Sequence, residues 1–473
     1  MAIQNRYLEF EQKMVGDIYT SFETMDNLLI LCDEFGSRFG GTEGERQAAE
    51  YMVGKLKEYG LENAKLEEFD YYGWIRGPAS LQVASPLSRE VPCISLPYSP
   101  PADLEASLVN IKEGTPAEFE RLHEQIAGKI VMANTRTPQS LGRWMHRSEK
   151  YNRSVVAGAV GFIWMQHLEG LGPETGSITG NREALIPGVS VAKEWGDFLA
   201  RILEKKGEIR LRLKTQDETR LMKSWNVVAE LKGRVAPDEM VVIGAHYDGH
   251  DISQGAEDPA SGTVVVLEAA RVLAKIADRL ERTVRFIAFG NEETGLIGSR
   301  EYVKAHMSEL SKMRFMLNLD SAGGARSRKG IVLNSWPELD SFFRDAAKEM
   351  GAMMPVGQKT SAFSDHYPFF LEGVPTGSMG DTEAPQTGRG FGHTHWDMAD
   401  KVHISNLREA AANVARVVLR IANEKDWPAS RRDLEAVQTL LDKEPGLPEV
   451  TKLRGQIDEI YEKKGLMTFE SMI

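Results

Sequence analysis

The sequence predicts an α/β protein with a mainly parallel mixed sheet that is flanked by helices on both faces. Three segments, 241–244, 283–289 and 313–319, are short and largely apolar. Such runs are typical of strands that are buried on both faces. Helical patterns over 263–280 and 294–305 separate these strands. This alternation predicts crossover connections within a parallel sheet.

The stretch from 73 to 223 differs in character from the segments on either side of it. Short β-like runs at 108–111 and 129–132 lie between many Pro and Gly turns. Segment 153–164 passes from a helix to a strand through small residues and resembles the middle of a protease-associated domain. We therefore expect an inserted, β-rich domain of the protease-associated kind. The predicted division is a discontinuous main domain over 1–72 and 224–427, the insert over 73–223, and a C-terminal helical tail over 428–473.

The other elements of the main domain follow from periodicity and from turn residues. Amphipathic patterns predict one or two helices within 1–31 and another that ends at Gly60, because glycine commonly terminates a helix. Residues 65–72 form the expected first strand, and a strand that begins at Trp225 resumes the domain after the insert. Two further helices are expected over 338–350 and 405–423.

Composition excludes several classes of partner. The 473 residues include 57 Lys and Arg against 69 Asp and Glu, a formal net charge of −12. The sequence contains no basic patch, so we expect no nucleic-acid partner. No run approaches the roughly 18 apolar residues that a membrane span needs, so we expect no membrane partner. The N-terminus lacks the features of a signal peptide, which predicts a cytoplasmic protein. The charged tail favours packing or contact within a homo-oligomer.

Chemistry-bearing side chains follow each of the predicted central strands. His246 and Asp248 come at the carboxyl end of the first strand, and Asp258 lies in the loop before the next helix. The pair Glu292-Glu293 follows the second strand. In open α/β sheets, sites form at the carboxyl edge of the strands. Asp320 follows the third strand in the same way, and His393 lies in a short polar loop ahead of the last helix.

This combination of side chains indicates a metal centre. An Asp after a strand, taken singly, is more often a helix cap or a turn residue. Two imidazoles and three carboxylates together suit a pair of zinc-like ions that share a carboxylate. Adjacent carboxylates such as Glu292 and Glu293 repel each other unless positive charge lies nearby. Ser364-Asp365 either caps a helix or contributes to the site.

Several motifs, in this order, resemble the M28 family of di-zinc exopeptidases, and within it the carboxypeptidase Q branch. The resemblance covers roughly residues 25–425. The motifs are FGSRFGGT, AHYDGHDISQGAEDPASG, FGNEETGLIGS, NLDSAG, SDHYPFFLEGVP and GHTHWD. The resemblance implies a zinc exopeptidase-like fold in which the main domain is catalytic.

The resemblance also implies a role for each matching residue. His246 and Asp320 would bind one zinc ion, and Glu293 and His393 would bind the other. Asp258 would bridge the two ions. Glu292 stands where the family has its general base, and Asp248 where a carboxylate orients a ligand histidine. The implied cofactors are two divalent transition-metal ions, Zn²⁺ first, with Co²⁺ or Mn²⁺ as alternatives.

The expected activity is metal-dependent hydrolysis of a terminal bond in short peptides or dipeptides, of the aminopeptidase or dipeptidase type. A glutaminyl cyclase, an acyltransferase that works with one zinc in the same fold, is one alternative. The complete set of five ligand residues argues against it. A non-catalytic, receptor-like binding protein is the other alternative, and such members are expected to lack ligands that are present here.

Overall fold

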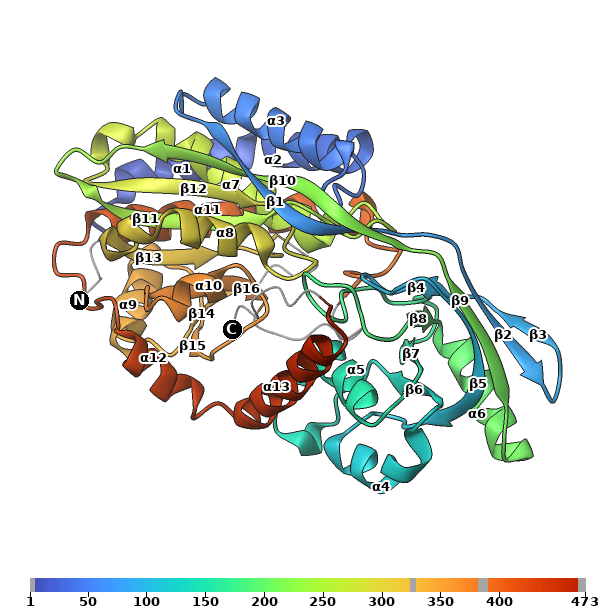
Figure 1. The fold of residues 1–473 in the computed structure, drawn as a ribbon. Helices are drawn as coiled ribbons and strands as arrows, with labels where there is room; N and C mark the ends of the chain where they lie inside the picture. Colours follow the sequence, from blue (N-terminus) through green and yellow to red (C-terminus); the bar gives the residue numbers. More distant parts are fainter. Residues whose placement is uncertain (1–4, 324–328, 382–389, 467–473) are drawn as a thin grey trace. The chain divides into compact units, whose positions relative to one another are not determined.

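The structure is a computed structural model that describes residues 5–323, 329–381 and 390–466. The chain divides into two compact units, coloured along the sequence in Figure 1. The first unit comprises Met1–Asp70 and Lys223–Leu440. The second comprises Tyr71–Met222 and Leu441–Ile473. Among the described residues, no helix combines the length and the apolar character needed to cross a bilayer.

An eight-stranded mixed sheet with the order β1-β10-β12-β11-β13-β16-β14-β15 forms the centre of the first unit. Strand β11 pairs in parallel with both of its neighbours, β12 and β13, and β13 pairs in parallel with β16. Strand β10 is antiparallel to β12, and β14 is antiparallel to β16. The strands are β1 (Lys65–Ile75), β10 (Glu218–Leu231), β11 (Ala236–His246), β12 (Arg282–Phe289), β13 (Met313–Asn318), β14 (Lys329–Leu333), β15 (Val356–Gln358) and β16 (Thr376–Asp381).

The central strands are buried because both faces of this sheet are covered. Side chains alternate between faces along a strand. Val241 and Ile243 of β11 accordingly belong to one apolar core, and Met240 and Val242 belong to another. A strand that contributes apolar side chains to both faces has no polar alternation in its sequence. This explains why the continuous apolar runs predicted the mainly parallel sheet correctly.

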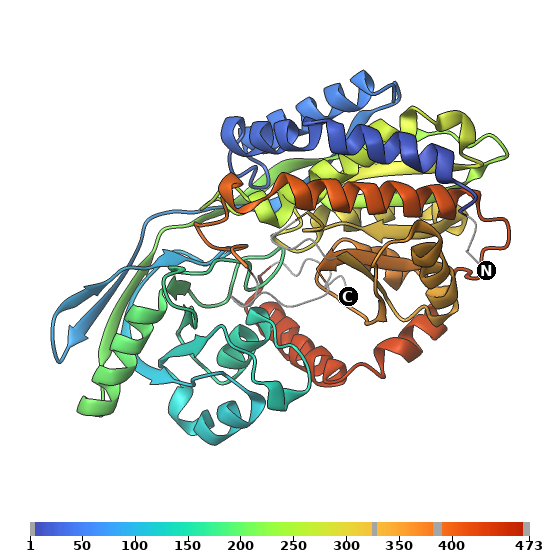
Figure 2. The ribbon, with the colours of Figure 1, turned by 180° about the vertical axis from the view of Figure 1, so that it is seen from behind.

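Helices cover the two faces unequally. One face carries α1 (Leu8–Thr20), α2 (Glu23–Leu29), α3 (Glu43–Glu58), α7 (Ser261–Ala274) and α11 (Ile404–Asn423). Figure 2 shows α11 in red-orange running alongside the blue N-terminal helices on this face. Helices α8 (Ile297–Ala305) and α10 (His366–Leu371) pack on the other face, and α9 (Asp340–Met350) packs beside β15.

Two helices are shorter than the sequence analysis predicted. Helix α7 ends at Ala274, where the pattern extended the helix to 280, because Ile276 leaves helical backbone angles before a short 3-10 turn. Helix α8 begins at Ile297 and not at 294, because Leu296 adopts a positive φ of 60°. A non-glycine residue in that region is uncommon and interrupts regular helix.

The second unit contains its own eight-stranded sheet, with the order β3-β2-β9-β5-β6-β7-β8-β4. The pairs β5–β6, β6–β7 and β7–β8 are parallel, and the other pairs of neighbouring strands are antiparallel. Within the described part of the insert, α-helices accompany the sheet, so the insert is β-rich but contains helical layers as well. The strands are β2 (Ala79–Ser85), β3 (Arg89–Val91), β4 (Ile94–Ser95), β5 (Ala102–Asn110), β6 (Ile130–Asn134), β7 (Gly161–Met165), β8 (Gly188–Val191) and β9 (Arg210–Thr215), and the helices are α4 (Pro116–Ile126), α5 (Arg147–Val156) and α6 (Lys193–Lys206).

The C-terminal segment, which we expected as one tail over 428–473, is divided between the two units. Helix α12 (Leu434–Leu441) lies almost entirely in the first unit, and α13 (Leu447–Lys463) belongs to the second. Ile457 and Tyr461 of α13 are part of an apolar core of the second unit. The Tyr461 hydroxyl also donates to the carbonyl of Glu183 at 2.6 Å. The likeness of the insert to a protease-associated domain stays a prediction.

Candidate metal centre

The carboxyl end of β11 leads into a loop that is held in place by a buried arginine. His246 is the last residue of β11, and the loop continues to Asp258. The Arg38 guanidinium, which is fully buried, donates to the carbonyls of Tyr247 at 2.8 Å and Gly255 at 2.8 Å. Arg38 belongs to the FGSRFGGT motif, far from the loop in the sequence. These two hydrogen bonds therefore tie Arg38 to backbone carbonyls near both ends of the loop between the two predicted ligands.

Helix α7 begins unusually close to the end of β13. A Cβ atom on Gly262 would lie 1.9 Å from the Asp320 carbonyl oxygen and 2.1 Å from that of Leu319. Only glycine permits this approach of helix to strand. The contact brings the loop that ends at Asp258 next to Asp320, although 62 positions separate these residues in the numbering.

His246 faces two carboxylates through one ring nitrogen and the backbone through the other. Its Nε2 lies 3.3 Å from Asp258 Oδ1 and 3.4 Å from Asp320 Oδ1. Its Nδ1 lies 3.0 Å from the carbonyl of Asp248. Burial by itself lowers the pKa of His246, but Glu292 and the hydrogen bonds to nearby carboxylates raise that pKa well above its usual range. This pocket strongly favours positive charge.

His393 faces the other oxygen of the same aspartate. Its Nε2 lies 3.5 Å from Asp258 Oδ2 and 3.3 Å from Glu293 Oε2. The two carboxylate oxygens of Asp258 therefore point to different histidines, Oδ1 to His246 and Oδ2 to His393. The backbone of His393 adopts a positive φ of 65°, a conformation that few non-glycine residues adopt.

The side chains of two buried aspartates, Asp248 and Asp397, accept hydrogen bonds from backbone amides around the centre. Asp248 accepts from the amide N–H of Glu292 at 2.8 Å and from that of Glu293 at 3.2 Å. Asp397 accepts from the amide N–H of Glu257 at 2.6 Å and from that of Asp258 at 3.1 Å. Burial raises the pKa of Asp397 to about 7. Asp397 belongs to the GHTHWD motif, but the sequence analysis gave it no role.

Glu292 lies on the His246 side of the centre. Its carboxylate, His246 and Asp320 each offer one atom, and these three atoms lie within 4.8 Å of one another. Burial raises the pKa of Glu292 well above its usual range; His246 opposes the rise, and Glu293 and Asp365 add to it. Glu292 was expected as a base and not as a ligand, and its position beside two expected ligands is compatible with either role.

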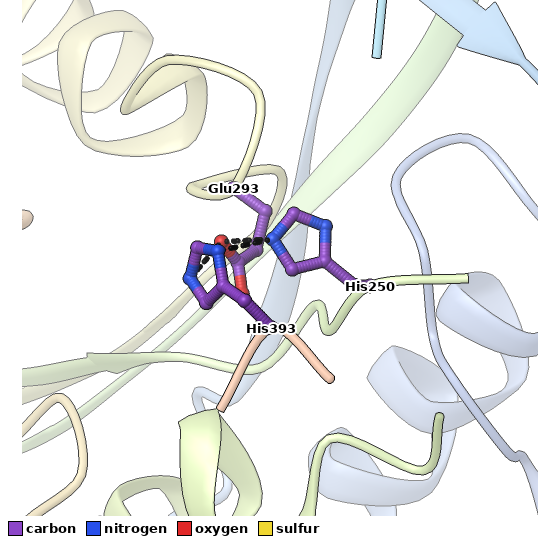
Figure 3. Close-up of side chains that lie close together, drawn as sticks. All are labelled: His250, Glu293 and His393. Carbon is purple, nitrogen blue, oxygen red and sulfur yellow. Dashed lines mark hydrogen bonds and ion pairs between the residues drawn. The ribbon is translucent and has the colours of Figure 1, made fainter. Parts of the chain in front are cut away.

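His250 is a residue of the centre that the sequence analysis missed. Its Nε2 lies 2.9 Å from Glu293 Oε2 and 3.1 Å from His393 Nδ1. The three buried side chains point toward one another from separate loops (Figure 3), and one atom of each lies within 4.8 Å of the others. His250 stands only two positions after Asp248 in the AHYDGHDISQGAEDPASG motif, so a histidine at that spacing was an available signal.

Ser364 and Asp365, for which helix capping and a place in the site were both considered, lie beside the centre. Ser364 Oγ donates to Asp320 Oδ2 at 2.5 Å and accepts from the Asn318 side-chain amide at 2.6 Å. Asp365 occupies the N-cap position of α10, but its side chain makes no capping hydrogen bond. Burial raises the pKa of Asp365 to about 7, with His246 opposing the rise.

The spacing of the donor atoms fits divalent metal ions. Zinc binds nitrogen and oxygen ligands at about 2.0–2.2 Å, so two donors at a tetrahedral angle on one ion are about 3.3–3.5 Å apart. The distances from His246 and His393 to their carboxylates are 3.3–3.5 Å, longer than usual for hydrogen bonds between charged groups. Nearby cations would also neutralise several carboxylates whose pKa values burial raises.

Fold and site together define a class of protein: an α/β protein with a mixed sheet, whose centre of histidines and carboxylates suits divalent cations. Residues 226–418 match the family model of peptidase family M28. The chain therefore carries a peptidase family M28 domain and belongs among the peptidases, as the motifs predicted.

Relatives of known name match most of the chain. Aminopeptidase YwaD of Bacillus subtilis (strain 168) is 28% identical over 411 residues, which cover 84% of each protein. Carboxypeptidase Q of Mus musculus is 26% identical over 415 residues, which cover 84% of this chain and 85% of the relative. The solved structure of a zinc aminopeptidase from Bacillus subtilis matches with a TM-score of 0.68 at 26% identity, covering 87% of this chain and 97% of that one.

Proposed function

We propose that this protein is a metal-dependent exopeptidase that hydrolyses a terminal bond of short peptides or dipeptides with two metal ions. The observation that carries the proposal is the orientation of Asp258, whose two carboxylate oxygens face different histidines. A carboxylate placed in this way could serve two divalent ions, one through each oxygen. Asp320 would complete the His246 side, and Glu293 would complete the His393 side.

The surrounding residues would perform the proton transfers and hold the ligands. When bound, two divalent cations would supply polarisation of a peptide carbonyl and a lowered pKa for the attacking water. Glu292 would accept the proton of the attacking water and pass it to the departing amine. Asp248 would orient His246, whose Nδ1 faces the Asp248 carbonyl, and would fix the Glu292-Glu293 backbone, whose two amides donate to the Asp248 carboxylate.

The names of the relatives support an exopeptidase but include both aminopeptidases and carboxypeptidases. We propose the aminopeptidase or dipeptidase type, with Zn²⁺ as the metal and Co²⁺ or Mn²⁺ as replacements. A set of imidazole and carboxylate ligands suits these ions better than Mg²⁺ or Ca²⁺, which prefer oxygen ligands alone.

Replacing the proposed bridge tests the two-ion centre. Asp258→Ala should reduce the metal content from two ions per chain to fewer than one, because the bridge serves both ions, and should abolish dipeptide hydrolysis. Asp238→Ala is the matched control, since Asp238 is exposed on the same strand, β11. Metal analysis after exhaustive dialysis, together with turnover on dipeptides and end-blocked peptides, provides the measurement.

Other outcomes would favour the alternatives. One tightly bound ion per wild-type chain, with cyclisation of N-terminal glutamine and no hydrolysis, would replace this proposal with the glutaminyl cyclase. Two ions without turnover on any terminal bond would favour a non-catalytic binding protein.

A further inference from the structure

Two loops that are far apart in the sequence carry expected metal ligands and lie against each other at the centre. Residues 254–258, which we call the aspartate loop, end at Asp258. Residues 390–399, which we call the histidine loop, contain His393. A Cβ atom on Gly392 would lie 3.0 Å from Asp258 Oδ2, so the backbone of the histidine loop closely approaches the proposed bridge. The facing of the two ligands therefore depends on how the loops are held together.

The hydrogen bonds between the two loops are reciprocal. Asp397 of the histidine loop accepts from two successive amides of the aspartate loop, that of Glu257 at 2.6 Å and that of Asp258 at 3.1 Å. In return, Glu257 Oε2 accepts from the amide N–H of Phe391 at 2.9 Å. Each loop therefore supplies one expected ligand and one carboxylate that holds the backbone of the other loop.

Both of these carboxylates are buried and fit closely into the opposite loop. Asp397 is 1% exposed and Glu257 is 6% exposed. A Cβ atom on Gly390 would lie 2.7 Å from both carboxylate oxygens of Glu257, so glycine makes room for that side chain. Successive backbone N–H groups form a binding arrangement for an anion, and hydrogen bonds to an ionised acceptor are roughly twice as strong as neutral ones. Asp397 thereby fixes the backbone from which the Asp258 side chain extends.

We propose that Asp397 and Glu257 form a reciprocal clamp that holds Asp258 and His393 in their facing arrangement independently of bound metal. The inference rests on the proposed metal centre, which gives the clamp two ligands to position. Asp397 and Glu257 are positioning residues, because they act through the backbone of the opposite loop. All the partners in the clamp are protein groups, so its hydrogen bonds need no ion. Ligands that are already in place bind an ion more tightly, because binding does not have to order the loops.

The first measurement is amide hydrogen exchange in the full-length protein after a chelator has removed metal. The exchange is followed by mass spectrometry on peptides that contain Glu257, Asp258 and Phe391. We expect slow exchange of these amides without metal. Asp397→Asn should accelerate exchange at the first two, because an asparagine side chain has one acceptor oxygen and sets its NH₂ group against the other amide. Rapid exchange in the metal-free wild-type protein, with protection only after zinc is added, would overturn the proposal.

Zinc titration against a competing chelator provides the second test. Asp397→Asn should weaken the binding of both ions about 10- to 100-fold, because Asp258 is proposed to serve both. Glu257→Ala should weaken mainly the ion on the His393 side, because Glu257 holds the histidine loop. Glu257→Gln keeps an oxygen that can accept from the Phe391 amide, so it should restore most of that affinity. A role in overall stability alone would not separate the two ions in this way.

Asp400→Asn is the matched control, since Asp400 is exposed three positions after Asp397. It should change neither the exchange rates nor the zinc affinity. Wild-type zinc affinity in Asp397→Asn would contradict the clamp, and so would equal losses of affinity in Glu257→Ala and Glu257→Gln.

The clamp can fail separately from the proposed function. If the wild-type protein binds two zinc ions and Asp397→Asn binds them equally well, only the clamp is overturned. If the wild-type protein binds no zinc, the proposed function and the role of the clamp in metal binding are both overturned. Circular dichroism shows whether each variant is folded, and the comparison of Glu257→Ala with Glu257→Gln decides the matter if Asp397→Asn does not fold.

Discussion

Glu292 and Glu293 are neighbours in the chain, but their carboxylates face different partners. Glu293 Oε2 faces His393 and His250, whereas the Glu292 carboxylate lies with His246 and Asp320. Successive side chains leaving a strand point in different directions, so adjacent glutamates can serve separate functions. The amides of both residues are fixed by Asp248, which keeps this divergence of the two side chains in place.

The two glutamates can be distinguished by the same conservative substitution. Glu292→Gln removes the proton acceptor but keeps size and hydrogen bonding, so both ions should remain while turnover falls about 10²-fold or more. Glu293→Gln should instead weaken the binding of one ion. The test pairs metal analysis with steady-state kinetics on each variant. Loss of metal in Glu292→Gln, with both ions retained and slow turnover in Glu293→Gln, would reverse the assignment.

The residues of the centre differ in how far sequence reasoning could reach them. His246, Asp258 and Asp320 follow predicted strands, and the rule that sites form at the carboxyl edge of a sheet points to them directly. Arg38 and Asp397 act on backbone groups more than 100 positions away. Contacts of that kind depend on the tertiary fold, which periodicity and spacing do not specify.

At the scale of elements, the strands were easier to predict than the helix ends or the strand order. Apolar runs identified β11, β12 and β13, because burial on both faces determines their composition. Helix α8 begins late because of the left-handed backbone at Leu296, which the letters TGLIG do not indicate. The antiparallel placement of β14 beside β16 depends on long-range pairing and has no local signal.

One contact between elements makes stability depend on pH. Glu67 of β1 lies 3.0 Å from His306 Nε2, just after α8, and this hydrogen bond raises the pKa of His306. A raised folded-state pKa means that the stabilisation is fully present below the unfolded value of about 6.5 and is lost as pH rises through the folded value. Glu67→Gln should therefore lower the free energy of unfolding by about 1 kcal/mol at pH 6 and by less at pH 9.

Urea unfolding of the wild-type protein and the Glu67→Gln variant at both pH values measures this difference. Glu62→Gln is the control, because Glu62 is exposed in the turn that precedes β1. Glu67 also pairs with Lys65 at 2.9 Å, so part of the deficit should persist at pH 9. A deficit that stays constant or grows between pH 6 and pH 9 would show that protonated His306 is not the source.

At the scale of the whole molecule, the two units have separate cores and separate reasons for stability. The proposed metal centre lies entirely in the first unit, since all its residues fall within Met1–Asp70 and Lys223–Leu440. Helix α13 contributes to the second unit, far along the chain from the rest of that core. Compact units with their own cores can unfold in separate transitions.

Calorimetry should therefore resolve two transitions that respond to different changes. A chelator should lower only the transition of the first unit, because ions that bind the folded state stabilise the unit that holds them. Ile457→Ala should lower the temperature of the other transition only. The free energy of unfolding of the second unit should fall by about 2–5 kcal/mol, because Ile457 is 1% exposed in the core of that unit. Lys452→Ala, exposed on the same helix, is the control and should leave both transitions unchanged. If the chelator and Ile457→Ala shift the same transition, the units unfold together and the tail stabilises the metal centre.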